Sequence, residues 1–150
     1  DDKDLYQLLG ITAGEVEKYE VNRTLPVSIA KPEKYGNFAY VPRKRHPDAK
    51  RFEFARFLGS YYMAENDPSE WLVSSELATA TQKRQRAFAA EFLCPVDSLI
   101  GFLNDDFTEN AIEDASEYFG VSEQTVTSIL QNNTYISNPR EYDAPYRWAY

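Results

Sequence analysis

The chain of 150 residues has a single cysteine, Cys94, and a single histidine, His46. One cysteine excludes a disulfide bond within the chain, and one histidine excludes a zinc site that requires two. Cys94 lies in the apolar run EFLCPV, which indicates a buried structural thiol. His46 precedes Pro47 and has no second ligand at metal spacing, so we interpret it as an exposed loop residue.

Several other chemical patterns are also missing. None of the six glycines stands in the spacing of a phosphate-binding loop, and no nucleophile-elbow sequence is present. Carboxylates are plentiful, but none forms a pair in a pattern typical of acid–base catalysis. No apolar run approaches the roughly 18 residues that a membrane helix needs, and no secretory signal is seen. We therefore expect a protein of the reducing cytoplasm that contacts no membrane.

What is present indicates a folded core. Hydrophobic residues make up 43% of the chain and aromatic residues 15%, which argues against disorder. Residues 25–31 alternate apolar and polar and predict a strand, and NFAYV (37–41) predicts a second strand, so that the two pair as an antiparallel hairpin. From Pro47 onward the apolar period becomes helical. We expect a single α+β domain over residues 1–150, with a short antiparallel sheet packed on several helices and a helical C-terminal part.

Two long helices carry most of the apolar periodicity. Residues 48–64 predict an amphipathic helix, and residues 76–93 predict a second helix that ends before Pro95. The positions expected to face inward are Phe52, Ala55, Leu58, Gly59 and Tyr62 in the first helix, and Phe88 and Phe92 in the second. Further helices are expected before Gly10, after Thr12, at 96–103, from Thr108 to Gly120 and after Ser122.

Charge is unevenly distributed along the chain. The formal net charge of −8 disfavours nucleic-acid binding by the whole domain, because phosphate contacts need clustered Lys and Arg. The stretch PRKRHPDAKR (42–51) is nevertheless basic. Its cations are Arg43, Lys44, Arg45, Lys50 and Arg51. They predict either a solvated loop before a helix or a patch for a partner or a nucleic acid.

The stretch DASEYFGVSEQTVTSIL (114–130) has the pattern of a helix-turn-helix, with Gly120 at the turn. From Gly101 to Thr134, however, the chain has seven acidic residues and no Lys or Arg. The acidic residues are Asp105, Asp106, Glu109, Glu113, Asp114, Glu117 and Glu123. A recognition helix without cations would face phosphate repulsion over its whole footprint. We expect this element to pack on the domain or to contact a protein partner.

Three stretches follow one another at a characteristic spacing: RFEFARFLGSYYM (51–63), QKRQRAFAAEFLCP (82–95) and the segment 114–130. In this order they resemble the ImmA/IrrE-type metallopeptidase domain. The resemblance extends over about residues 20–132, and the hairpin GNFAYVPRKR ahead of the first motif also suits the family. It implies a small zincin-like fold. Residues 133–150 follow the resemblance, have aromatics and prolines without periodicity, and are expected to form a C-terminal arm that packs on the domain or reaches a partner.

The resemblance also implies zinc-ligand positions, which this chain fills with other residues. Arg56 and Ser60 stand where the family has its two His ligands. Phe57 replaces the Glu general base, and Gln82 replaces the Glu that is the third ligand. A guanidinium keeps its proton and repels a cation, and a phenyl ring cannot transfer a proton. We therefore expect a pseudopeptidase, with no catalytic residue, no metal site and no cofactor.

A replacement for the metal site is one expectation. Arg56 and Ser60 share one face of their helix, and Gln82 and Arg86 share one face of theirs. If the family fold is kept, these two faces meet over the former metal site. The two cations would then either pair with carboxylates or bind a small anionic ligand. The candidate carboxylates are Glu53, Glu76 and Glu91.

We expect a non-catalytic domain that acts in regulation or protein interaction. Active members of the family it resembles cleave helix-turn-helix repressors, in mobile elements and stress responses of bacteria and phages. The resemblance implies a partner of that kind, or other domains of the same chain. The first residues read as the interior of a domain, so a piece of a longer transcriptional regulator is expected. Two alternatives stay open: a nucleic-acid-binding module that uses residues 42–51, and a metallopeptidase with a relocated site.

Overall fold

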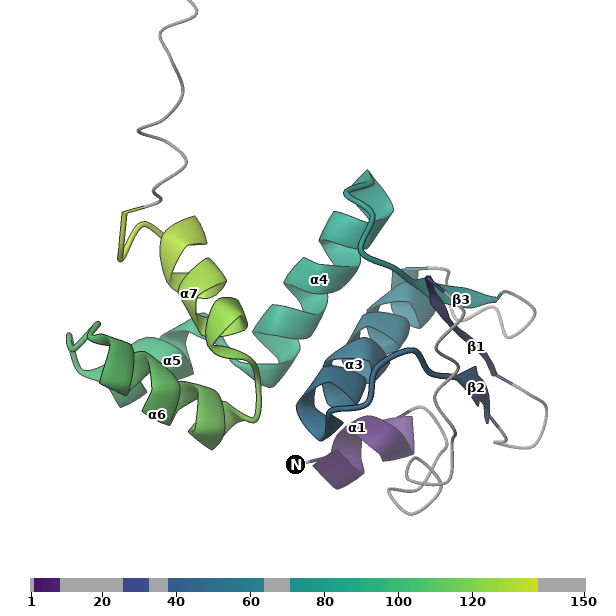
Figure 1. The fold of residues 1–150 in the computed structure, drawn as a ribbon, viewed down its shortest axis with the longest axis horizontal. Helices are drawn as coiled ribbons and strands as arrows, with labels where there is room; N and C mark the ends of the chain where they lie inside the picture. Colours follow the sequence, from purple (N-terminus) through teal and green to yellow (C-terminus); the bar gives the residue numbers. More distant parts are fainter. Residues whose placement is uncertain (1, 9–25, 33–37, 64–70, 138–150) are drawn as a thin grey trace, which may run out of the picture. The chain divides into compact units, whose positions relative to one another are not determined.

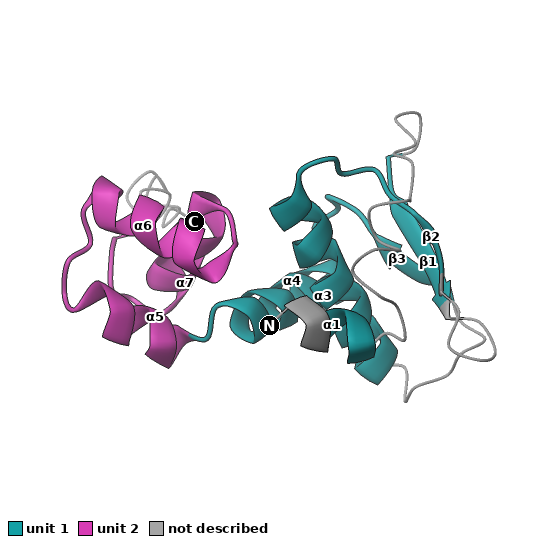
Figure 2. Cartoon of the chain, turned by 90° about the horizontal axis from the view of Figure 1, so that it is seen from below, with its two compact units in different colours: residues 1–95 teal, residues 96–150 magenta. Residues whose placement is uncertain are grey.

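The computed structural model describes residues 2–8, 26–32, 38–63 and 71–137. Within these ranges the chain forms six helices and one three-stranded antiparallel sheet (Figure 1), which confirms the expected α+β class. The chain divides into two compact units, residues 1–95 (unit 1) and residues 96–150 (unit 2), coloured separately in Figure 2. The expectation of a single domain over residues 1–150 stays a prediction.

The sheet belongs to unit 1 and has the strand order β2-β1-β3. Strand β1 (Ser28–Pro32) pairs antiparallel with β2 (Phe38–Val41), which confirms the predicted hairpin, although β1 begins three residues later than expected. Strand β3 (Leu72–Ser74) pairs with the other side of β1 and was not predicted, because three residues are too few to reveal a period. It therefore forms one edge of the sheet.

Helix α3 (Pro47–Met63) is the centre of unit 1. It packs on α4 (Ala80–Leu93), on β3 and on the short helix α1 (Asp2–Leu8), so it has neighbours on several sides (Figure 1). Every residue from position 53 to position 59 is buried. The predicted bounds are confirmed within one residue, and Ala55, Leu58 and Gly59 are buried as expected, but the predicted pattern is wrong at the two ends. Tyr62, expected to face inward, is exposed, and Phe52 is half-buried.

Helix α4 turns two glutamines toward the interior of unit 1. Its buried residues are Gln82, Gln85, Ala89 and Leu93. The expected inward pair is confirmed only in part: Phe88 is half-buried with its ring against Gly59 of α3, whereas Phe92 is exposed and stacks on Phe88 with ring centroids 5.8 Å apart. The helix begins at Ala80 instead of residue 76, because the Thr79 side chain accepts a hydrogen bond from the N–H of Gln82 at 3.2 Å.

The close approach of α3 and α4 depends on Gly59. A Cβ atom at this position would lie 2.7 Å from Cδ1 and 2.8 Å from Cγ of the Phe88 ring. Real side chains do not approach that closely, so any larger residue would push the two helices apart or displace the ring. Glycine at position 59 therefore fixes the distance between the two helices that carry the candidate site.

Unit 2 contains α5 (Val96–Leu103), α6 (Glu109–Phe119) and α7 (Glu123–Asn132). The predicted caps are confirmed: the side chains of Thr108 and Ser122 accept hydrogen bonds from backbone N–H groups of α6 and α7. Gly120 ends α6 in the left-handed conformation, with φ of 60°, which glycine adopts without strain. Apolar side chains fill the interior: Leu99, Leu103, Ala115, Val121, Val126, Ile129 and Leu130.

Some expectations fall on parts of the chain outside the described residues. They are the helix that Thr12 would begin and the part of the C-terminal arm beyond residue 137. Within the described ranges, no helix combines the length and the apolar character that crossing a bilayer requires.

Candidate functional site

A buried arginine stands at the point where α3, α4 and β3 meet. Only 3% of Arg56 is exposed, yet its guanidinium is surrounded by neutral acceptors. Nη2 donates to the carbonyl of Ser75 at 2.8 Å and to Oε1 of Gln82, with a longer contact of 3.4 Å to Oε1 of Gln85. Burial, and then the charge of Arg86, lowers the pKa of Arg56 to about 10. The side chain is therefore still a cation at neutral pH.

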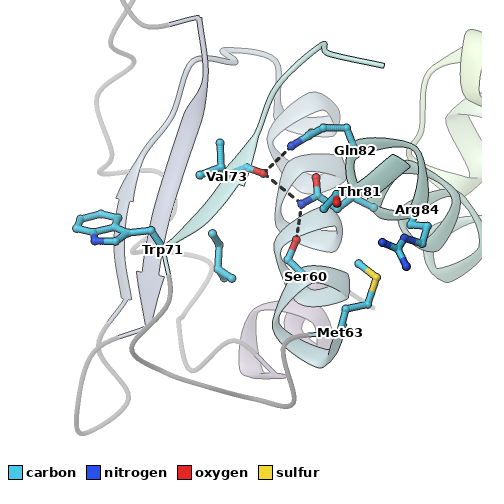
Figure 3. Close-up of a pocket in the computed structure, with 9 residues that line it drawn as sticks. Ser60, Met63, Trp71, Val73, Thr81, Gln82 and Arg84 are labelled. Carbon is cyan, nitrogen blue, oxygen red and sulfur yellow. Dashed lines mark hydrogen bonds between the residues drawn. The ribbon is translucent and has the colours of Figure 1, made fainter. Parts of the chain in front are cut away.

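Two glutamines of α4 connect this arginine to the edge of the sheet. Gln82 accepts from the N–H of Ser75 at 3.1 Å and donates to the carbonyl of Val73 at 3.2 Å. Gln85 donates to the same carbonyl at 3.2 Å and to Oγ of Ser60 at 2.6 Å (Figure 3). We call Arg56, Ser60, Gln82 and Gln85 the Arg56 cluster. Its hydrogen bonds join two helices and one strand.

The cluster also closes an edge of the sheet. Strand β3 is an edge strand, and such strands usually leave backbone N–H and C=O groups free to pair with another chain. Here the Val73 carbonyl and both backbone polar groups of Ser75 are bonded to side chains of Arg56, Gln82 and Gln85. These side chains take the place that a fourth strand would occupy along this short stretch.

The sequence analysis singled out five residues around the expected former metal site, and the structure brings three of them together. Arg56, Ser60 and Gln82 belong to one hydrogen-bonded cluster. Phe57 lies in the core, with its ring 5.7 Å from that of Tyr40. Arg86 is half-buried and donates to the carbonyl of Leu77 at 3.1 Å. Sequence reasoning missed Gln85, although its place three residues after Gln82, on the same helix face, was an available signal.

The carboxylates expected beside Arg56 bond elsewhere. Glu53, 2% exposed, accepts hydrogen bonds from Ser28 at 2.6 Å, Tyr40 at 3.0 Å and Ser74 at 3.3 Å. One of its oxygens lies 3.1 Å from Nε of Arg43. Among the described residues, the hydrogen-bond acceptors of Arg56 are neutral. The proposed pairing of Arg56 with a glutamate is therefore replaced by bonds to amides and a backbone carbonyl.

Glu53 and its neighbours form a second buried polar group in unit 1. Burial, the charge of Glu53 and the hydrogen bond to it all raise the pKa of Tyr40, so the phenol is a neutral donor. Oε2 of Glu53 accepts hydrogen bonds from the hydroxyls of Ser28 and Tyr40. Oε1 accepts a hydrogen bond from the hydroxyl of Ser74 and forms an ion pair with Arg43. Both oxygens of this carboxylate are engaged, so it is not placed to activate a water molecule.

The basic stretch 42–51 is partly neutralised by acidic residues. Arg43 is mostly buried and lies 2.8 Å from Glu76 as well as close to Glu53. Lys44 also contacts Glu76, at 3.0 Å, and hydrogen bonds from Lys44 and Arg43 lower the pKa of Glu76 to about 2. Of the remaining cations, Arg45 is exposed, and Lys50 and Arg51 are half-buried. This arrangement does not favour a continuous phosphate-binding surface.

The two residues that occur once in the chain lie as expected. His46 is exposed, and its Nδ1 lies 3.3 Å from Oδ2 of Asp48. Cys94 is fully buried, and burial, together with the charge of Glu91, raises the pKa of its thiol to about 11. Both sequence-based interpretations are confirmed.

A pocket of about 490 Å³ opens beside the Arg56 cluster (Figure 3). Ser60, Gln82 and Gln85 belong both to the cluster and to the pocket wall. The rest of the wall is formed by Met63, Trp71, Leu72, Val73, Thr81 and Arg84. The pocket is therefore lined by amides, hydroxyls and one guanidinium, together with several apolar side chains.

No protein-family model, curated protein or solved structure matches this chain. The resemblance to the ImmA/IrrE-type domain stays a prediction.

Proposed function

We propose that unit 1 is a non-catalytic binding domain, a pseudopeptidase on the ImmA/IrrE-type framework. The observation that carries this proposal is the convergence of Arg56, Ser60 and Gln82 in one cluster. These are the three positions that the family motif assigns to zinc ligands. Two of them lie on α3 and one on α4, as the motif requires, although the residues themselves cannot hold zinc.

The chemistry of the cluster explains how a domain of this kind keeps its shape without a metal. A zinc ion between α3 and α4 would link the helices through its ligands. In this chain the guanidinium of Arg56 supplies the positive charge, and Gln82 and Gln85 supply neutral oxygens in place of anionic ligands. The position of the general base is occupied by Phe57, which is part of the core. The arrangement suits binding rather than bond cleavage.

The lining of the neighbouring pocket also supports a binding role. The pocket beside the cluster has Arg84 and Thr81 on its wall, which suits a small anionic ligand or a loop of a protein partner. We propose a helix-turn-helix repressor, or another domain of the same chain, as that partner, in a regulatory system of the cytoplasm.

The proposal is tested by restoring the ligands. The triple variant Arg56→His/Ser60→His/Gln82→Glu carries the family's three ligand types at the three converging positions. After dialysis, elemental analysis should find one zinc per chain in the variant and no stoichiometric zinc in the native protein. Phe57 is left in place, because a glutamate there would be buried in the core.

The matched control moves one carboxylate by a single position. In Arg56→His/Ser60→His/Lys83→Glu the new glutamate is on the exposed face of α4, so zinc should bind far more weakly. Circular dichroism establishes that each variant is folded. Stoichiometric zinc in the native chain would refute the proposal, and so would equal zinc binding by the folded triple variant and its control.

A further inference from the structure

Two large aromatic rings lie exposed and side by side on unit 2. Phe102 at the end of α5 and Tyr118 at the end of α6 stack with ring centroids 4.7 Å apart and planes inclined by 28°. Tyr118 is 70% exposed and Phe102 is 40% exposed. The interior of the unit is filled by aliphatic side chains, so neither ring is needed to close it. Adjacent exposed rings of this size are typical of a contact surface.

The charge around these rings has one sign. From residue 96 to residue 137 the chain has eight acidic side chains and no Lys, Arg or His, and all eight acidic side chains are exposed. On α6, Glu117 directly precedes Tyr118, and Asp114 lies one helical turn before it. Within residues 96–137 no cation is present to neutralise these carboxylates. A partner that covers them must bring its own positive charge.

We propose that Phe102, Tyr118, Asp114 and Glu117 form a docking surface for a protein segment rich in Arg and Lys. Aromatic faces attract guanidinium and ammonium groups, and the neighbouring carboxylates form hydrogen-bonded ion pairs with the same groups. We call these four residues the acidic aromatic surface. The inference depends only on unit 2 and not on the origin of the Arg56 cluster, so either proposal can fail without the other.

The negative charge of this surface disfavours other occupants. Duplex DNA and anionic lipid surfaces carry negative charge and are repelled by eight exposed carboxylates without a compensating cation. In a second copy of the chain, the exposed charges of residues 96–137 would have the same sign. A basic protein segment is the occupant whose charge is complementary and whose guanidinium groups can also use the rings.

The test uses the full chain and a synthetic helical peptide of about 12 residues built from Arg-Ala-Ala-Lys repeats. On titration into isotope-labelled protein, the largest shifts of amide resonances should fall at and around the four residues of the acidic aromatic surface. Replacing both rings, as Phe102→Ser/Tyr118→Ser, should weaken binding about tenfold. Tyr62→Ser, which removes an exposed ring from unit 1 outside the pocket wall, should leave the affinity unchanged.

A second pair of variants separates a docking surface from general attraction. Asp114→Asn/Glu117→Gln and Glu109→Gln/Glu123→Gln remove the same charge from unit 2, but only the first pair lies beside Tyr118. The first should weaken peptide binding about tenfold and the second no more than about twofold. Equal losses would overturn the proposal. So would duplex DNA or a second copy of the chain binding at these residues.

Discussion

The two units of this chain use charge in opposite ways. Residues 1–95 contain fourteen acidic and fourteen basic residues, and some of these, such as Glu53 and Arg56, are buried and hydrogen-bonded. Residues 96–137 contain eight acidic residues and no basic ones, and all of them face solvent. Unit 1 therefore uses polar groups to position its own elements. Unit 2 has an apolar interior and directs its charge outward.

Because of this difference, the stability of the two units should respond differently when charged side chains are replaced. A buried charge is stabilised only by the specific groups that bond to it, so losing one partner leaves others unsatisfied. An exposed charge is stabilised by water and is nearly neutral for folding. Substitutions that look alike in the sequence should thus have large effects in unit 1 and small effects in unit 2.

The largest expected effect is at Glu53. Replacing Glu53 by Ala leaves Arg43, Ser28, Tyr40 and Ser74 without a shared acceptor, and it should lower the free energy of unfolding of unit 1 by about 3–5 kcal/mol. Glu113→Ala in unit 2 is the matched control, with an expected change within about 0.5 kcal/mol. Residue-resolved hydrogen exchange of α3 and α6 measures each unit separately. Similar losses of stability for Glu53→Ala and Glu113→Ala would contradict the proposed difference between the two units.

The second-largest loss of stability is expected when the Arg56 cluster is disrupted. Arg56→Met keeps the length of the side chain but removes the donor to Ser75, Gln82 and Gln85, which should cost about 2–3 kcal/mol. The exposed Arg84→Met on α4 should change stability by less than about 0.5 kcal/mol.

A double-mutant cycle sharpens this prediction. If Arg56 and Gln82 act as one unit, Arg56→Met/Gln82→Leu should cost less than the sum of the two single changes, by about 1 kcal/mol. Chemical denaturation of the four proteins gives the coupling energy. Full additivity would show that the two side chains are neighbours without energetic coupling.

Replacing glycine by alanine should change stability in opposite directions at two positions, Gly59 and Gly101. Gly59→Ala places a methyl group against the Phe88 ring and should destabilise unit 1 by about 1–2 kcal/mol. Gly101 lies within α5, and a Cβ there meets no atom within 4 Å, so Gly101→Ala should stabilise unit 2 by about 0.5–1 kcal/mol. Thermal unfolding measures the stability of each variant. Hydrogen exchange of the amides of α3 and α5 then assigns the change to unit 1 or to unit 2. A stabilising Gly59→Ala would contradict the close helix contact.

The smallest effect should appear with pH. The pKa of Glu76 is lowered to about 2 in the folded chain, so its stabilising contribution is present above the ordinary value near 4.5 and is lost as pH falls toward 2. Because Glu76 is largely exposed, the loss should be only a few tenths of a kcal/mol after screening by solvent. Glu76→Gln should remove this part of the acid sensitivity, whereas Glu117→Gln in unit 2 should not.

The parts of the fold that local chemistry determines were predictable from the sequence. The caps at Thr108 and Ser122 and the end of α6 at Gly120 depend on residues within one helical turn, and the bounds of α6 follow from them. Strand β3 and the burial of Gln82 depend on elements that are distant in the sequence. No local pattern could reveal them.

The candidate site was predictable only in part, for the same reason. Arg56, Ser60 and Gln82 were singled out by their places in the motifs, and the structure brings them together. The acceptors of Arg56 could not be predicted, because a buried cation is expected to face a carboxylate and here faces amides. Glu53 bonds instead to residues of three strands and a loop, which only the folded arrangement places around it.

The burial of Cys94 has a practical consequence for studying the chain in motion. This thiol is the only one present, it follows the last turn of α4, and it is held protonated at neutral pH. An alkylating reagent can modify it only after that end of the helix opens, since the reactive form is an accessible thiolate. Mass spectrometry can measure the rate of labelling without any mutation. This rate reports how often the C-terminal end of α4, at the end of unit 1, opens.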